Sequence, residues 1–475
     1  MRHQQPEQSR FMHVVVENTV CLNTGDAAIL IAIKEILDRA LGEEAKIYVF
    51  DSNPEVSERL YKEKKYKNLT FRKLLSEQVF KYEHDRNFLK NLAKKAFNKI
   101  RLHAIGQLGR GNEALANLVL DKESRKSLEI YRGADFVVTT GGTYLVENYN
   151  LKKRILQFQI DSLMQKAPIF FTQSLGPFNN GYNRISLKSV LNESPLILLR
   201  DEKSLGHISN IVRDRTKCHV VADAVFALAD TQRITDILAA STPPAPTGRV
   251  GISVRNWNYV KDGQDGMRRY IEAVGQLVIS LVQQGKKVTF VSTCQGVPEY
   301  AHDDSKTARA IVTELDPSIA ESVSIDSSFH TPEQLMELVK GFDFVVATRM
   351  HMMIMSLCVG TPVLPIAYEF KTKELAARLG ISEVLMDIDT IAAEEAAGKL
   401  QLFSEKLEDF RKTSLKSVLM ENASALSSVE LLKRVIGSTA SAASSDGADH
   451  LLADDEGDPT RLGHRQRNQT GQQIA

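Results

Sequence analysis

Short apolar runs alternate with longer amphipathic runs along most of the chain. This alternation is typical of α/β proteins, in which buried parallel strands are joined by helices. We therefore predict parallel sheets covered by helices. In the first half the predicted strands span 11–16, 46–50, 135–140, 168–173, 196–200 and 219–221, and predicted helices include 26–41 and 149–165.

A break in the pattern follows at residues 241–248, where STPPAPTG holds three prolines and a terminal glycine. Such a composition favours a linker. The alternation then resumes, and Thr331 and Pro332 resemble an N-cap followed by a proline in the first helical position. The predicted strands of the second half are 250–254, 287–292, 322–325, 344–347 and 363–367, with helices over 266–284, 303–315, 331–340, 351–359 and 371–380.

We predict two Rossmann-like domains that face a cleft, over residues 11–240 and 249–395. In this arrangement the ends of many strands surround one site. A further helix over 401–436 is expected to pack back across the first domain. The tail, 437–475, is rich in Ser, Ala, Asp and Gln with few apolar residues, which predicts disorder.

Composition narrows the class of protein. The net charge of +1 gives no global field that would collect nucleic acid. The four cysteines lie far apart without a CxxC pair, which argues against a disulfide framework or a zinc site and fits a reducing cytosol. The N-terminus lacks the apolar core of a signal peptide. The apolar stretch 350–368 contains Gly360, Pro362 and Pro365, so we read it as a buried helix and strand, and expect a cytoplasmic protein.

Residues 61–110 stand apart because they hold 14 lysines and arginines against 4 acidic residues, a local excess of +10. Apolar residues such as Phe71, Phe88 and Leu92 are interspersed, so we interpret the segment as a basic helical insertion in the first domain. One interpretation is a solvated helical face. The other is a patch for an anionic membrane or for a polyprenyl diphosphate substrate, with the protein peripheral at the inner face of the plasma membrane.

Candidate site residues of the first half follow predicted strands. Asp26 opens a helix after a Gly turn and either caps that helix or faces a ligand. Gly141 and Gly142 end a strand, where they either form an ordinary turn or let a ligand approach the backbone. Arg200 ends strand 196–200 and either binds an anion or pairs with an acid. Asp223 follows the last strand.

The strongest cluster lies in the second half, where Arg349 and His351 follow strand 344–347 and open a helix. A lone histidine is more often structural, but one beside an arginine at such a junction favours function. Glu369 and Lys371 begin the next helix, where a solvated cap is the alternative. Arg255 follows strand 250–254.

These strand ends hold several cations and few unpaired carboxylates, which suits a small, highly anionic substrate. There is no HExxH motif or Walker loop, and we interpret Asp303 and Asp304 as acids at a helix start. The sequence therefore indicates neither a metal nor another cofactor.

The chain resembles the polysaccharide pyruvyl transferases, and is especially similar to the colanic acid type. The resemblance covers residues 14–380 in a single order. It rests on the segments NTGDAAIL, TGGTYL, QSLGPF, LLRDEKSL, ADAVFAL, GISVRNW, VSTCQG, TRMHMMIMSLCVGTPVL and IAYEFKTK.

The resemblance implies a GT-B-like fold, phosphoenolpyruvate as donor and a sugar diol as acceptor, with a cyclic pyruvate ketal and phosphate as products. It implies functional roles for Arg349, His351 and Arg200. Gln173 departs from some members, which have histidine there, so proton transfer is expected to fall on His351. The first domain is expected to bind the acceptor, in one version an oligosaccharide linked to polyprenyl diphosphate, and the second to bind the donor.

Roles for the remaining candidates follow from this chemistry. Arg255, Lys371 and the amides near Gly141 and Gly142 are expected to hold the donor beside Arg200 and Arg349, with His351 as general acid and base. The carboxylates expected to contact the sugar hydroxyls are Asp26, Asp223 and Glu369.

Two alternatives remain open. A GT-B glycosyltransferase using a nucleotide sugar would share the architecture. Against it, Ala377 stands eight residues after Glu369, where many such enzymes have a second glutamate. A non-catalytic, anion-binding scaffold protein would bind phosphoenolpyruvate at most, without releasing phosphate.

Overall fold

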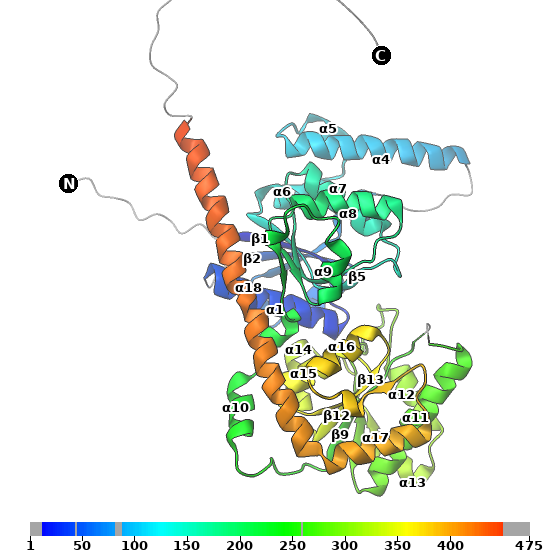
Figure 1. The fold of residues 1–475 in the computed structure, drawn as a ribbon. Coiled ribbons are helices and arrows are strands. Elements are labelled where there is room, and N and C mark those ends of the chain that lie inside the picture. The colour runs from blue at the N-terminus through cyan, green and yellow to red at the C-terminus, as the bar shows by residue number, and fades with distance from the viewer. Residues whose placement is uncertain (1–11, 43–44, 81–87, 258–259, 450–475) are drawn as a thin grey trace, which may run out of the picture. The chain divides into compact units, whose positions relative to one another are not determined.

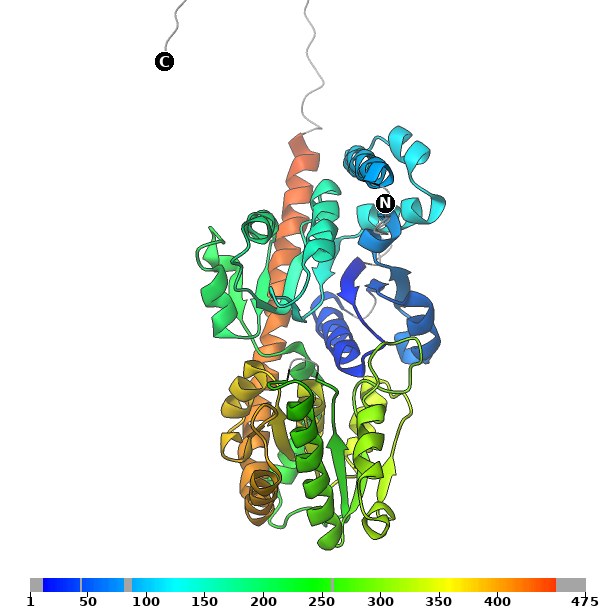
Figure 2. The same ribbon diagram turned by 90° about the vertical axis from the view of Figure 1, so that its right-hand side faces the viewer.

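The structure, a computed structural model, describes residues 12–42, 45–80, 88–257 and 260–449. Residues 1–432 form one compact unit, and the remainder of the chain forms a second. The first unit contains two parallel sheets with helices on both faces (Figures 1 and 2). The α/β prediction with two Rossmann-like sheets is therefore confirmed.

The first sheet has the order β3-β2-β1-β4-β6-β7-β8, and β5 pairs with β6. All of its pairings are parallel, and the order reverses direction between β1 and β4. The strands are β1 (His13–Thr19), β2 (Lys46–Asp51), β3 (Leu69–Lys73), β4 (Phe136–Thr139), β5 (Gly142–Leu145), β6 (Ile169–Leu175), β7 (Ile197–Leu199) and β8 (Cys218–Val220).

The second sheet has the order β11-β10-β9-β12-β13-β14 and reverses direction between β9 and β12. Its strands carry Val, Ile, Leu and Phe at successive positions because helices cover both faces of the sheet. They are β9 (Arg249–Ser253), β10 (Lys287–Phe290), β11 (Val323–Ile325), β12 (Phe344–Ala347), β13 (Val363–Ala367) and β14 (Met386–Asp387).

Helices connect the strands. Those of the first half are α1 (Thr24–Leu41), α2 (Pro54–Leu60), α3 (Leu75–Val79), α4 (Phe88–Gly109), α5 (Ala114–Val119), α6 (Lys122–Gly133), α7 (Lys152–Leu163), α8 (Gly181–Glu193), α9 (Glu202–Ile208) and α10 (Thr231–Ala239). Those of the second half are α11 (Gln264–Gln283), α12 (Ser305–Thr313), α13 (Pro317–Ala320), α14 (Pro332–Val339), α15 (Met350–Cys358), α16 (Phe370–Arg378), α17 (Ala393–Glu405) and α18 (Leu407–Asp449).

Most predicted strands and helices are present with ends shifted by one to three residues, and the Thr331 capping box with Pro332 is confirmed. Strand 11–16 begins later, at His13, and Phe11 lies outside the described residues. Three strands were not predicted. β5 follows the glycine turn directly, β14 has only two residues, and β3 lies within the basic segment 61–110. That segment is therefore not purely helical. Its residues Leu69 and Phe71 are buried as part of β3, which pairs with β2.

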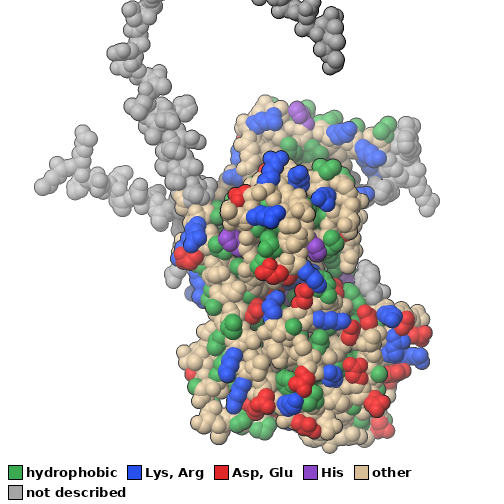
Figure 3. Space-filling model, viewed as in Figure 1, with side chains coloured by type: hydrophobic (Ala, Val, Ile, Leu, Met, Phe, Trp, Pro, Cys, Tyr) green, Lys and Arg blue, Asp and Glu red, His purple; other side chains and the backbone are tan. Residues whose placement is uncertain are grey.

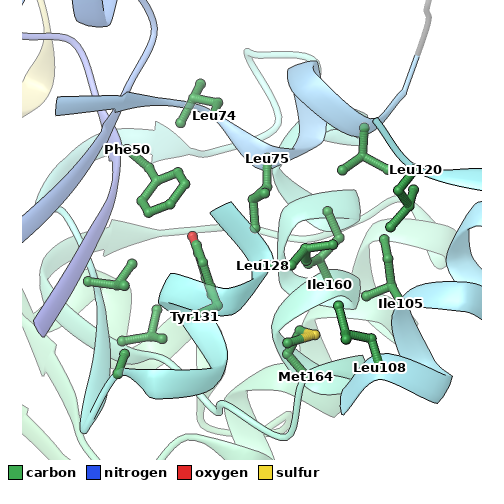
Figure 4. Close-up of a cluster of buried hydrophobic side chains, with 14 of the residues drawn as sticks. Phe50, Leu74, Leu75, Ile105, Leu108, Leu120, Leu128, Tyr131, Ile160 and Met164 are labelled. Carbon is green, nitrogen blue, oxygen red and sulfur yellow. The ribbon is translucent and has the colours of Figure 1, made fainter. Parts of the chain in front are cut away.

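A buried cluster in the first half joins the sheet to the helices above it (Figure 4). Phe50 of β2 packs edge-on against Tyr131 of α6, with ring centres 4.8 Å apart. Ile105 and Leu108 bring the C-terminal half of α4 into the same cluster. The C-terminal half of α4 therefore packs against the first sheet through this buried cluster.

Contacts between the two halves hold the strand ends of both sheets near one another. Thr24, at the start of α1, donates its backbone N–H to the carbonyl of Thr293 at 2.9 Å and its hydroxyl to the carbonyl of His330 at 2.7 Å. The strands divide between the sheets at the predicted linker 241–248. Because residues 1–432 form one compact unit, the bounds 11–240 and 249–395 stay a prediction.

The C-terminal helices return to the first half, as expected. Asn422 of α18 donates to the carbonyl of Phe226 at 2.8 Å, and Ser424 accepts from the backbone N–H of Ala222 at 3.0 Å. The bounds differ from the predicted 401–436, because α17 ends at Glu405 and α18 continues to Asp449. The last part of α18 thus extends into the segment 437–475, whose disorder stays a prediction. The rest of the predicted tail lies outside the described residues. Within the described chain no helix is sufficiently long and apolar to cross a membrane.

Candidate functional site

A pocket lies where the two sheets change direction. In open parallel sheets, the loops on either side of such a point diverge and leave a crevice beyond the carboxyl ends of the strands. Here the loops after β1 and β4 meet the loops after β9, β10, β12 and β13 around a cavity of about 210 Å³. Its walls include Asn18, Asn23, Asp26, Thr140, Gly141, Gly142, Thr143, Tyr144, Tyr149, Arg154, Arg255, Thr293, Arg349, His351, Tyr368 and Glu369.

Arg349 is held in the pocket wall by a buried carboxylate. Its Nε and one terminal nitrogen donate to the two oxygens of Asp304 at 2.9 and 2.7 Å. Asp304 also accepts from the Ser292 hydroxyl at 2.6 Å. This bidentate pair orients the guanidinium and leaves its other N–H groups for a ligand. Asp304 was read from the sequence as an acid at a helix start. Asp304 and Arg349 are 45 residues apart, so no local sequence pattern predicts their pairing.

His351 lies in the first turn of α15 and is largely buried. Its Nε2 lies 3.8 Å from Asp223, and no hydrogen-bond partner for this nitrogen is present among the described residues. The ring packs on the start of α1, because a Cβ added to Gly25 would come within 2.9 Å of Nδ1. Glycine at position 25 therefore makes room for the imidazole at the pocket.

Arg200 and Asp223 form a buried pair behind this histidine. Arg200 donates to Asp223 at 2.6 Å, to Ser174 at 2.8 Å and to Thr143 at 2.8 Å. Neither side chain is among the pocket walls. Burial alone would raise the pKa of Asp223, but His351 and the Arg200 charge hold it well below its usual range. Asp223 thus stays ionised beside His351, while Arg200 binds this carboxylate and does not line the cavity.

Arg255 presents a cation to the pocket. Its guanidinium lies over the rings of Tyr368 and Trp257, 3.9 and 4.2 Å from their centres. Its Nε has no hydrogen-bond partner within the part of the chain that the structure describes. Burial lowers the pKa of Arg255 from its ordinary value, and the charge of Arg349 adds to this effect. Two arginines line this pocket, and one of them has no carboxylate partner in the described segments, which favours an anionic ligand.

Arg154 of α7 is a third pocket arginine, which the sequence analysis missed. It donates to the side-chain oxygen of Asn18 and lies over the Tyr144 ring, 4.8 Å from its centre. Asn18 has φ 65°, a left-handed conformation, where the pairing register of β1 shifts. Such a bulge re-aims a side chain at a strand end. The positive φ of Asn18 cannot be read from a helical or strand pattern.

Gly141 and Gly142 are needed for the backbone turn that follows β4. A Cβ on Gly141 would come within 2.7 Å of the Thr172 hydroxyl, and Gly142 has φ 121°. Both line the pocket. Gln173 is buried behind them and donates to the carbonyl of Thr140. It is not among the pocket walls.

Two carboxylates reach the pocket itself. Asp26 accepts from Asn23 at 2.8 Å, and burial raises its pKa, while the charges of His351 and Arg349 partly offset the rise. Glu369 is the N-cap residue of α16, and no backbone amide there is bound by its side chain. Both can accept hydrogen bonds from ligand hydroxyls. In the described parts of the chain, no three His, Cys, Asp or Glu side chains are grouped so as to hold a metal ion.

Lys371 lies outside the pocket wall, in the first turn of α16. Its Nζ is buried and has no hydrogen-bond partner among the described residues. Burial lowers the pKa of Lys371 to about 7, and the nearby Arg200 charge contributes. The amine therefore titrates near neutral pH instead of supplying a permanent charge to a donor substrate.

We expect the Lys371→Met variant to be more stable than the wild type at pH 7. The folded lysine has a lowered pKa, so the unfolded chain binds more protons between about pH 7 and 10. Wild-type stability should therefore rise with pH in this window, and the difference from the variant should shrink by about 1.4 kcal/mol per pH unit. Urea unfolding at pH 7, 8 and 9 measures this, and parallel stability curves would contradict it.

Most of the pocket wall lies in a segment that matches a known protein family. A family model described as "Polysaccharide pyruvyl transferase" matches residues 23–369, a span that includes most of the pocket wall. The amylovoran biosynthesis protein AmsJ of Erwinia amylovora is 23% identical over 418 residues, covering 86% of this chain and 95% of AmsJ.

Two solved structures are similar at low identity. HepE of Anabaena in complex with UDP-glucose gives a TM-score of 0.48 at 13% identity, covering 91% of this chain and 100% of that one. Sucrose-phosphate synthase of Thermosynechococcus elongatus gives 0.49 at 11% identity, covering 90% and 100%.

Proposed function

The chain belongs to the polysaccharide pyruvyl transferase family, and we propose that it transfers pyruvyl from phosphoenolpyruvate to two hydroxyls of one sugar as a cyclic ketal. The observation that carries this proposal is the set of three arginines, Arg154, Arg255 and Arg349, around one small cavity. Phosphoenolpyruvate carries a carboxylate and a phosphate, and guanidinium groups match both. The similarity to an amylovoran biosynthesis protein supports an exopolysaccharide precursor as acceptor.

The reaction requires two additions at one carbon. C3 of the donor takes a proton while a sugar hydroxyl oxygen bonds to C2. The C2–O bond to phosphate then breaks, phosphate leaves with the electron pair, and the second hydroxyl oxygen bonds to C2. The two hydroxyls lose two protons. One replaces the proton given to C3 and the other leaves on the phosphate, so atoms and charges balance without a redox step.

We assign the proton transfer at C3 to His351. It lines the pocket, and its Nε2 lies 3.8 Å from the ionised Asp223 carboxylate. Asp26 and Glu369 would accept protons or hydrogen bonds from the sugar hydroxyls. Arg200 supports this assembly by holding Asp223 and Thr143. In this assignment Asp223 and Arg200 position His351 rather than contact the substrates.

Anion binding is assigned to the arginines. Arg255 and Arg349 lie together and would neutralise one anionic group of the donor, and Arg154 of α7 lines the same cavity. Their charges would also stabilise phosphate as it leaves, because the negative charge on the departing oxygen grows in the transition state.

Phosphate release from phosphoenolpyruvate tests the proposal. Purified protein is given the donor with and without aryl or lipid-linked galactosides, glucosides and mannosides. We expect release only with a suitable acceptor, together with the mass gain of one pyruvyl ketal on the sugar. Donor binding without release on any acceptor would favour a scaffold role. Sugar-nucleotide binding by calorimetry, with no donor binding, would favour a glycosyltransferase.

A further inference from the structure

The N-terminal half of α4 carries apolar side chains that no core covers. Ile105 and Leu108, in the C-terminal half, belong to the buried cluster of Figure 4. In contrast, Leu92, Phe97 and Ile100 are 56, 43 and 45% exposed. Single exposed apolar residues are common on protein surfaces. An exposed Phe, Ile and Leu within three turns of one helix instead form a cluster.

These residues share one face of the helix. Leu92, Ala96 and Ile100 are spaced at i, i+4 and i+8, and Phe97 stands beside Ala96 and Ile100, so together they form a continuous stripe. We call this set, Leu92, Ala96, Phe97 and Ile100, the α4 stripe. It lies apart from the pocket, whose walls include no residue of α4.

Basic residues flank the α4 stripe on both sides. At 100° per residue, Lys95 and Lys99 fall on one side of it, and Lys90 and Lys94 fall on the other. Residues 88–109 contain no Asp or Glu. Figure 3 shows blue and green side chains together at the top of the described surface, whereas many of the red ones lie over the second half of the chain.

We infer that the α4 stripe docks on an anionic lipid surface, with α4 lying in the plane of the interface. An amphipathic helix with an apolar face and lysines along both borders suits this environment, because the apolar side chains enter the acyl boundary while the amines reach the lipid headgroups. A second copy of the chain fits less well, since two surfaces with only positive charges would repel one another.

A groove lies beside the C-terminal half of α4. Leu102 and His103 of α4 line this groove of about 550 Å³ with Ile155, Phe158 and Ile185 from α7 and α8. Its exposed surface is mainly apolar, and Ile185 is 73% exposed. The groove therefore adds apolar surface near the α4 helix. The inference concerns this surface alone and does not depend on the proposed reaction.

Co-sedimentation of the full chain with vesicles tests the inference. We expect binding to vesicles of phosphatidylcholine with 30% phosphatidylglycerol, weaker binding as salt rises, and little binding to phosphatidylcholine alone. Lys95→Glu with Lys99→Glu should weaken binding about 20-fold or more, since each basic residue near such a surface contributes about fivefold. Leu92→Glu with Phe97→Glu should abolish it.

The matched control is Met420→Glu, which alters a 74% exposed apolar side chain on α18 and should bind vesicles as the wild type does. All of these positions are exposed, so we expect unchanged thermal unfolding. Wild-type binding by the Leu92/Phe97 variant, or equal binding to both vesicle types, would overturn the inference. So would self-association of the wild type, seen by light scattering, that these substitutions remove. Phosphate release on a water-soluble acceptor, measured in parallel, keeps the outcome separate from the proposed reaction.

Discussion

Replacing His351 by alanine is expected to lower kcat by about 10²–10⁴-fold, the usual contribution of a positioned general acid or base. Binding of phosphoenolpyruvate should remain within about threefold, because the arginines of the pocket are unchanged. The fold should persist, since Asp223 keeps its bonds to Arg200 and to the backbone N–H of Val225. Acceptor-dependent phosphate release gives kcat, and calorimetry gives donor affinity.

His219→Ala is the matched control. His219 lies on β8 and is not among the pocket walls, so this variant should keep wild-type kinetics. Full activity of the His351 variant would refute its role in proton transfer. A loss of donor affinity equal to the loss of kcat would instead assign His351 to binding the donor.

Replacing Arg255 by glutamine should weaken phosphoenolpyruvate binding by about 10–100-fold. A hydrogen bond to a charged group contributes about 1.5–3 kcal/mol, and each 1.4 kcal/mol is tenfold in affinity. The same change should leave the free energy of unfolding unchanged or slightly higher. Arg255 is buried beside Arg349, and no ion pair of Arg255 with another described residue is lost in the variant. Calorimetric titration and urea unfolding measure the two effects.

Arg249→Gln provides a control from the same strand. Arg249 begins β9 at its amino end, whereas Arg255 follows the carboxyl end. The control should bind the donor as the wild type does. If Arg255→Gln instead destabilised the fold with donor affinity intact, its contacts with Trp257 and Tyr368 would be its main role, and the anion site would have to rest on Arg349 and Arg154.

The sequence predicted the fold well because both sheets are parallel and covered on both faces. Buried strands then appear as short apolar runs, and the intervening amphipathic helices separate them clearly. Two of the three strands that were not predicted lack such an apolar run. β3 lies at an edge within a basic segment, and β14 has only two residues, so neither shows a continuous apolar run.

The sequence by itself also indicated that Arg349, His351, Arg255, Asp26 and Glu369 gather at one site, since each follows a strand whose carboxyl end meets the cleft. Only the tertiary structure decided what each does there. Arg200 and Arg349 both pair with acids, yet Arg349 keeps donors toward the cavity while Arg200 is enclosed.

Asp304 and Arg154 were missed for a related reason. Asp304 is 45 residues from the Arg349 it orients, and Arg154 is 136 residues from the Asn18 it binds. Local pattern shows the side of a strand or helix on which a residue lies. Which cation finds a carboxylate and which is left for a ligand depends on residues that only the packing of two sheets brings within hydrogen-bond distance.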